Sequence, residues 1–141
     1  MVSLQHPATE RPSASAVGLR LVIVALTLAT ATIHASLGGL LFTANAASYG
    51  TLAIAMIVPL PIARRYRWLI RFALIGFTLA TIGGWLAFGA RFPLAYLDKG
   101  IEALLFGCLV AEAYRLDGGP SESARRLLRL ARNGVGGLAG A

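Results

Sequence analysis

Four apolar runs, each about 20 residues long, constrain this chain more than any other feature of its sequence. They cover residues 21–42, 44–62, 72–90 and 96–114. As a helix, about 20 residues span about 30 Å, the thickness of the hydrocarbon layer of a membrane. Strands of a membrane barrel would alternate apolar and polar residues over about ten positions, and these runs do not alternate. The sequence therefore predicts an all-α integral membrane protein, an up-down bundle of four transmembrane helices.

The composition agrees with a membrane location. Hydrophobic residues make up 57% of the chain and charged residues only 13%, whereas about a quarter of the residues in a soluble domain are charged. A cleaved signal peptide is the main alternative for the first run, because ATIHAS at 31–36 resembles a small-residue cleavage site. The apolar run continues beyond that point, so we expect the first helix to be retained.

The basic residues are distributed unevenly between the two ends of the predicted bundle. Of the 13 lysines and arginines, all except Arg91 and Lys99 precede the first run, separate the second from the third, or follow the fourth. The positive-inside rule then places both termini in the cytoplasm, and we expect the protein in the bacterial inner membrane. The net charge of +7 is explained by this topology and by anionic lipid, so no nucleic-acid partner is predicted.

The chain divides into three parts by composition. Residues 1–16 are polar and predict a disordered cytoplasmic lead, residues 17–116 form the four-helix transmembrane domain, and residues 117–141 form a basic cytoplasmic tail. A short turn at 43–48, with Asn45 as the turn former, joins the first two helices. The short connections throughout favour antiparallel neighbours.

The tail carries a helical pattern after the breaker DGGP at 117–120. Apolar residues recur at Ala124, Leu127, Leu128 and Ala131, and arginines occupy the other face. This pattern predicts a short amphipathic helix that ends near Gly134 and lies on the inner leaflet. A disordered basic tail is the alternative. The residues expected at the membrane surface are Arg125, Arg126, Arg129 and Arg132.

Small residues recur at four-residue spacing in three of the predicted helices. Such stripes allow helix backbones to approach closely in lipid, either within one bundle or against another chain. The stripes are Ala31, Ala35 and Gly39; Gly76, Ala80 and Gly84; and Ala103, Gly107 and Ala111.

Charged residues at the start of the fourth run form the candidate site. His34 lies six residues, or about 9 Å, before the end of the first helix near Leu40, and Glu102 lies about as far past Tyr96. The two side chains can therefore share a level, and ionisable residues in the apolar layer usually face the bundle interior. The candidate polar pocket, on the outer side, comprises His34, Asn45, Asp98, Lys99 and Glu102.

Two interpretations of this pocket remain open. It is a functional site for protons or cations, or it is structural. In the structural case, Lys99 neutralises Glu102 three residues away, His34 and Glu102 lock the helices, and Asp98 stays among the lipid headgroups. Glu112 is expected to form a boundary ion pair beside Arg115.

No cofactor and no metal are predicted. A haem held by two histidines is disfavoured, because the second histidine, His6, lies in the polar lead. His34, Asp98 and Glu102 are suitable ligand types for a metal, but no spacing signature supports one. Cys108 is the only cysteine and is interpreted as a small packing residue.

Two stretches resemble a loose group of uncharacterised bacterial four-helix membrane proteins. That group has a histidine, a G-L-L-F-x-x-N stretch at the first hairpin and a charged last helix. The matching residues are His34, Gly39, Leu40, Leu41, Phe42 and Asn45, followed by Tyr96, Lys99 and Glu102. The resemblance implies the fold and this choice of residues, but no activity.

The sequence as a whole predicts a non-enzymatic protein. The first hypothesis is a small subunit or scaffold that packs in the bilayer against other membrane proteins or against copies of itself. The second, from a different class, is a small transporter or proton- and cation-handling protein that uses His34 and Glu102. A third is a redox component or enzyme that acts on a lipid or quinone.

Overall fold

The computed structural model of the chain describes residues 13–138, and all regular secondary structure among them is helical. Residues 1–12, most of the predicted disordered lead, lie outside the described residues, and Ala14–Ala16 already belong to the first helix. The helices are α1 (Ala14–Leu37), α2 (Leu40–Ile57), α3 (Pro61–Arg65), α4 (Arg67–Phe88), α5 (Pro93–Asp117) and α6 (Pro120–Leu138).

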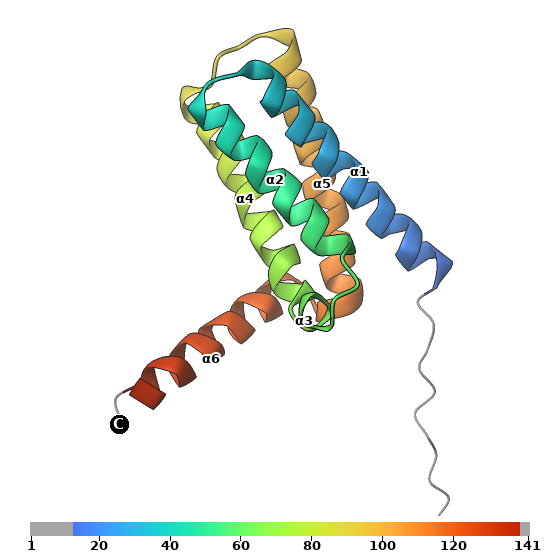
Figure 1. The fold of residues 1–141 in the computed structure, drawn as a ribbon, viewed down its shortest axis with the longest axis vertical. Coiled ribbons are helices and arrows are strands. Elements are labelled where there is room, and N and C mark those ends of the chain that lie inside the picture. Colours follow the sequence, from blue (N-terminus) through green and yellow to red (C-terminus); the bar gives the residue numbers. More distant parts are fainter. Residues whose placement is uncertain (1–12, 139–141) are drawn as a thin grey trace, which may run out of the picture.

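The four long helices α1, α2, α4 and α5 form an antiparallel bundle (Figure 1). α1 packs against α2 and α5, and α4 packs against the same two helices. We call the end with the α1–α2 and α4–α5 connections the hairpin end. The opposite end, with α3 and the start of α6, is the arginine end (Figure 1).

Three of the described helices, α1, α2 and α4, are long and apolar enough to cross a membrane. α5 is the longest, with 25 residues, and spans about 37 Å. Its sequence differs from the other three because it carries Asp98, Lys99 and Glu102 near its start and Glu112 near its end.

The turn between α1 and α2 lies earlier than the sequence predicts. α1 ends at Leu37, and Gly38 and Gly39 follow with φ angles of 68° and 82°. Only glycine adopts such angles without strain, so the pair of glycines, rather than Asn45, makes the turn. The prediction of Asn45 as a turn former is wrong, because this residue lies within α2.

Proline and glycine set the other helix limits. Pro61 and Pro93 begin α3 and α5, where a missing backbone N–H costs nothing. α5 ends where Gly118 adopts a left-handed conformation with φ 80°. The N–H of Gly119 then donates to the carbonyl of Ala113 at 3.0 Å, which gives this N–H beyond the helix end a backbone partner.

The tail folds as α6, which runs across the bundle axis at the arginine end (Figure 1). The helix continues past Gly134 to Leu138, so the predicted end at Gly134 is wrong. Glycine favours a helix end but does not require one. Arg125, Arg126 and Arg129 are exposed and lie within 3.8 Å of the carboxylate of Glu122.

The small-residue stripes of α4 and α5 do not pack inside this bundle. Their members, Gly76, Ala80 and Gly84 on α4 and Ala103, Gly107 and Ala111 on α5, are exposed. A Cβ atom added at Gly76, Gly84 or Gly107 would meet no atom within 4 Å. Packing within one chain, one of the two predicted uses of these stripes, therefore does not apply to α4 and α5.

Candidate functional site

The buried face of α5 determines where its charges lie. Its buried residues recur at spacings of three and four: Ala95, Asp98, Glu102, Leu105, Leu109 and Glu112. This spacing forms one stripe along a helix, so the carboxylates face the same interior as the leucines. The charges therefore form two clusters within the bundle, one at each end, separated by an apolar layer.

Glu102 is the centre of the cluster at the hairpin end. Its side chain is fully buried. Its Oε2 atom lies 2.6 Å from Nζ of Lys99, and its Oε1 atom accepts a hydrogen bond from the Tyr49 hydroxyl at 3.0 Å. Nζ of Lys99 also lies 3.0 Å from Oδ2 of Asp98. The ammonium group therefore bridges the two carboxylates.

His34 reaches the same cluster from α1. Its Nδ1 atom lies 3.0 Å from the carbonyl oxygen of Thr30, and a carbonyl oxygen can only accept, so Nδ1 carries a proton. The Nε2 atom lies 4.0 Å from Oε1 of Glu102. The backbone of α1 thus fixes the ring and leaves Nε2 directed at the carboxylate.

Asp98 contains an acceptor that the protein leaves unused. The residue is 2% exposed, and its Oδ1 atom is buried without a hydrogen-bond partner. Nδ1 of His34 lies 3.7 Å from this oxygen, which is too far for a hydrogen bond. The burial of Asp98 contradicts the prediction that this residue stays among the lipid headgroups. The i, i+4 spacing to Glu102 holds both carboxylates on the buried face.

Tyr49 belongs to the cluster although the sequence analysis missed it. It is fully buried, and its hydroxyl lies 2.9 Å from Oγ1 of Thr81 in addition to its bond to Glu102. Its ring centroid lies 5.7 Å from that of His34. A tyrosine one helical turn after Asn45 in an apolar run is the signal that would have indicated it.

A cavity of about 450 Å³ adjoins the cluster at the hairpin end. His34, Asn45, Thr81, Asp98 and Lys99 supply its polar lining, and most of the remaining surface is apolar. Asn45 lines the cavity, but within the described residues its side chain makes no hydrogen bond to the cluster.

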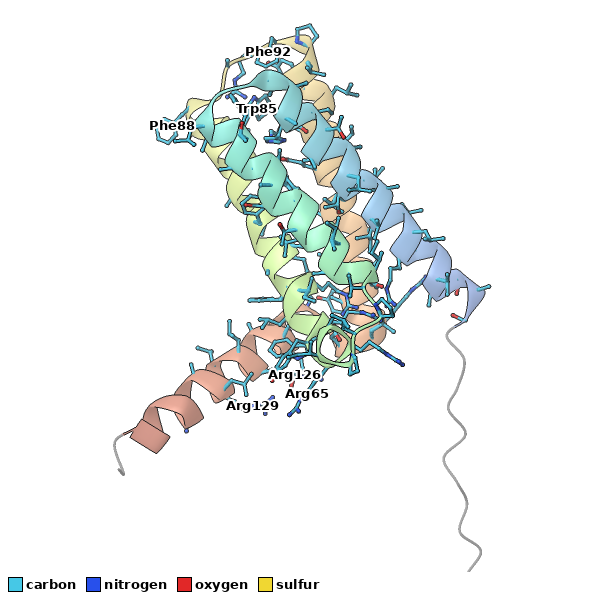
Figure 2. The ribbon with its side chains drawn as sticks, in the orientation of Figure 1. Arg65, Trp85, Phe88, Phe92, Arg126 and Arg129 are labelled. Atoms are coloured by element: carbon cyan, nitrogen blue, oxygen red, sulfur yellow. The ribbon has the colours of Figure 1, made fainter. Side chains whose placement is uncertain are left out.

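Aromatic side chains form much of the apolar lining. Phe42, Phe77, Trp85, Phe88 and Phe92 all contribute to it. Trp85, Phe88 and Phe92 lie together at the hairpin end (Figure 2). The cavity therefore gives small molecules and ions at the hairpin end access to the side chains of His34, Asp98 and Lys99.

The second cluster lies at the arginine end and differs from the predicted pair. Arg71 is 1% exposed, and its Nε donates to Glu112 at 2.9 Å. Arg20 approaches the other oxygen of Glu112 at 3.1 Å, and Arg71 also pairs with Asp117. The expected pair of Glu112 with Arg115 is wrong, because Glu112 faces the interior whereas Arg115 is exposed.

An apolar layer separates the two clusters. It consists mostly of fully buried apolar side chains from all four long helices: Ile23, Met56, Leu74, Leu105 and Leu109. Thr27 on α1 and Thr78 on α4 are also fully buried between the clusters. Among the described residues, no charged side chain is buried between the two clusters.

The comparisons with known proteins add no relative. No family model, no curated protein and no solved structure matches this chain.

We expect Glu112→Ala to destabilise the protein strongly. It would remove one of the two carboxylate partners of the buried guanidinium of Arg71, and breaking a buried ion pair in this way costs about 3–5 kcal/mol. The free energy of unfolding can be measured by denaturation with sodium dodecyl sulfate in mixed micelles. Glu122→Ala is the matched control on the exposed face of α6, and its effect should stay within about 0.5 kcal/mol. Equal effects of the two substitutions would contradict a stabilising role for this cluster.

Proposed function

We propose that the chain is a small transporter of the bacterial inner membrane that binds and exchanges protons or cations at the cluster of His34, Asp98, Lys99 and Glu102. The observation that carries the proposal is the fully buried carboxylate of Glu102, which accepts hydrogen bonds from Lys99 and Tyr49. His34 faces this carboxylate and lines the adjoining cavity. Ionisable groups at membrane depth are expensive, and those that persist usually mark a site or pathway.

The proposal includes α5 as a fourth membrane span. Its carboxylates at Asp98, Glu102 and Glu112 are buried, so they would not meet lipid. Its exposed face carries large apolar residues instead: Leu94, Tyr96, Leu97, Leu104, Tyr114 and Leu116. Burial of the charges removes the main objection to a span, because lipid would contact apolar side chains.

The orientation we propose follows from the two ends of the bundle. Arg65, Arg126 and Arg129 gather at one end, and Trp85, Phe88 and Phe92 at the other (Figure 2). The positive-inside rule assigns the arginine end, where α1 begins and α6 lies, to the cytoplasm. The cavity then opens on the outer side.

Reporter fusions test this topology. We expect a fusion at Arg65 or at the C-terminus to report the cytoplasm and a fusion near Pro93 to report the outside, because the basic residues concentrate at one end. Paired alkaline phosphatase and green fluorescent protein fusions give opposite signals at each position. A C-terminus on the outer side would contradict four spans.

The two ends of the interior differ as an outward-open transporter requires. The hairpin end has the cavity, whereas the arginine end is closed by the apolar layer and by the pairs among Arg20, Arg71 and Glu112. Exchange with the cytoplasm would require these pairs to separate, so we infer that they act as the inner closure.

Proteoliposomes test the exchange. A proton gradient is imposed across vesicles that contain an internal pH dye, with Na⁺, K⁺, Mg²⁺ and Mn²⁺ on both sides and valinomycin to clamp the potential. We expect the native protein to speed dissipation of the gradient. Glu102→Gln should reduce the rate to that of empty vesicles, because it keeps the shape and one acceptor oxygen but removes the charge.

Glu122→Gln is the matched control and should retain the native rate, since Glu122 lies on α6 away from the cluster. Size-exclusion elution and circular dichroism establish that each variant is folded. A folded Glu102→Gln protein with the native rate would contradict the proposal, and so would a native rate equal to that of empty vesicles.

We further propose that α6 lies on the inner leaflet. Its arginines at 125, 126 and 129 are exposed, its leucines at 127, 128 and 130 are also exposed, and the helix runs across the bundle axis (Figure 1). This combination suits a helix in the plane of the interface.

A peptide of residues 120–138 should gain helical circular dichroism with anionic vesicles and not with neutral ones. The gain should weaken with added salt, because salt screens the attraction between arginine and anionic lipid. A peptide with all four arginines from 125 to 132 replaced by glutamine is the control. An unchanged spectrum with anionic vesicles would contradict surface binding.

The exposed stripes of α4 and α5 favour a second candidate function, a subunit or scaffold within a larger membrane complex. Small residues facing lipid allow another helix to approach closely, and Gly76, Gly107 and Ala111 are exposed. A stable complex with different chains in mild detergent, identified by mass spectrometry, would support this candidate. A homo-oligomer alone would favour transport.

A further inference from the structure

We propose that His34, Asp98 and Glu102 form a binding site for a divalent transition-metal ion, and that the Lys99 ammonium occupies this site when the ion is absent. This inference rests on the proposed function and names the cation that the site exchanges. Three observations carry it: the convergence of the donor atoms, the hydrogen bond that orients His34, and the unused acceptor of Asp98.

The donor atoms converge as a metal site requires. One ligand atom from each of the three buried residues lies within 4.8 Å of the other two. Ligands of a bound ion at about 2.0–2.2 Å lie about 3–3.5 Å from one another. The side chains therefore need to close by about 1 Å around an ion, which rotation about side-chain bonds supplies.

The hydrogen bond of His34 prepares its ring for a metal. Nδ1 donates to the carbonyl of Thr30 at 3.0 Å, so Nε2 has a free lone pair near Glu102. Metal-ligating histidines almost always donate their other N–H to a backbone carbonyl or carboxylate, which fixes the tautomer. The arrangement at His34 matches this pattern.

The charge of the cluster is incomplete without a further cation. Two carboxylates, at Asp98 and Glu102, face one ammonium, at Lys99, which leaves −1 when His34 is neutral. Oδ1 of Asp98 has no partner although it is buried, and an unpaired buried acceptor is costly. A divalent ion in place of the ammonium would balance the charge of both carboxylates.

Lys99 has room to leave. Its side chain is 12% exposed and lines the cavity of about 450 Å³, so the ammonium can turn into that space when an ion enters. The same cavity supplies an entry path and the open coordination positions that water fills. Lys99 therefore acts as a tethered competitor of the ion.

The ligand set selects the class of ion. One imidazole nitrogen and two carboxylates suit Mn²⁺, Fe²⁺, Co²⁺ or Zn²⁺. Ca²⁺ takes six to eight oxygen ligands, and Mg²⁺ is bound through oxygen and retains several waters. The three donor residues and the single nitrogen fit neither of these hard ions.

Cobalt(II) provides the direct test, because its visible absorption reports the ligands around it. Full-length protein without an affinity tag is titrated with Co²⁺ in detergent, and Zn²⁺ is then added as a competitor. We expect one Co²⁺ per chain, displaced by Zn²⁺ and not by Mg²⁺. His34→Ala and Glu102→Gln should each weaken binding more than tenfold, since each removes a direct ligand.

The decisive variant is Lys99→Met, which should strengthen Co²⁺ binding by about tenfold or more because a competing charge is removed. Such a gain cannot arise from misfolding. Glu122→Gln and His6→Ala, which change the same residue types elsewhere in the sequence, should bind as the native protein does.

Absence of the cobalt band from both the native protein and Lys99→Met would overturn the metal assignment. Loss of the band in His6→Ala but not in His34→Ala would also overturn it. The proteoliposome measurement separates this inference from the proposed function. Proton exchange that depends on Glu102 without Co²⁺ binding contradicts the metal site alone, and Co²⁺ binding without such exchange contradicts the transport proposal alone.

Discussion

The rotation of α5 about its own axis is the constraint on which the rest of the structure depends. Asp98, Glu102 and Glu112 lie on one buried stripe. Each pairs with a side chain on another helix or on α5 itself. A rotation by one residue, about 100°, would turn these carboxylates toward the outer surface of the bundle and away from these partners. The bonds from Tyr49 and Arg71 to Glu102 and Glu112 therefore fix the helix that carries most of the chemistry.

The two charged clusters contain similar residue types but differ in what they can do. At the arginine end, the planar guanidinium of Arg71 donates to two carboxylates at once and is held in a fixed geometry. At the hairpin end, a flexible ammonium and an imidazole meet carboxylates with one oxygen still unused. A saturated cluster stabilises a fold, whereas an unsaturated cluster beside a cavity retains capacity for a ligand.

The sequence predicted the helical class and the shared depth of His34 and Glu102, because both follow from helix rise and from the cost of buried charge. The helix ends were harder: Asn45 and the glycines at 38 and 39 are all turn formers, and only the backbone angles decide between them. Tyr49 and the pairing of Arg71 with Glu112 depend on the rotation of neighbouring helices. Residue spacing along one helix does not contain that information.

The thickness of the apolar layer has an electrical consequence. Glu102 and Glu112 are ten residues apart on α5, or about 15 Å, which is half of the hydrocarbon thickness. If the bundle spans a membrane as proposed and water fills the cavity, most of the membrane voltage falls across this layer instead of across the whole bilayer. The local field there is then about twice that in lipid, and an ion held beside Glu102 sits near the outer potential. Its binding would depend little on voltage, while its passage inward would depend on it strongly.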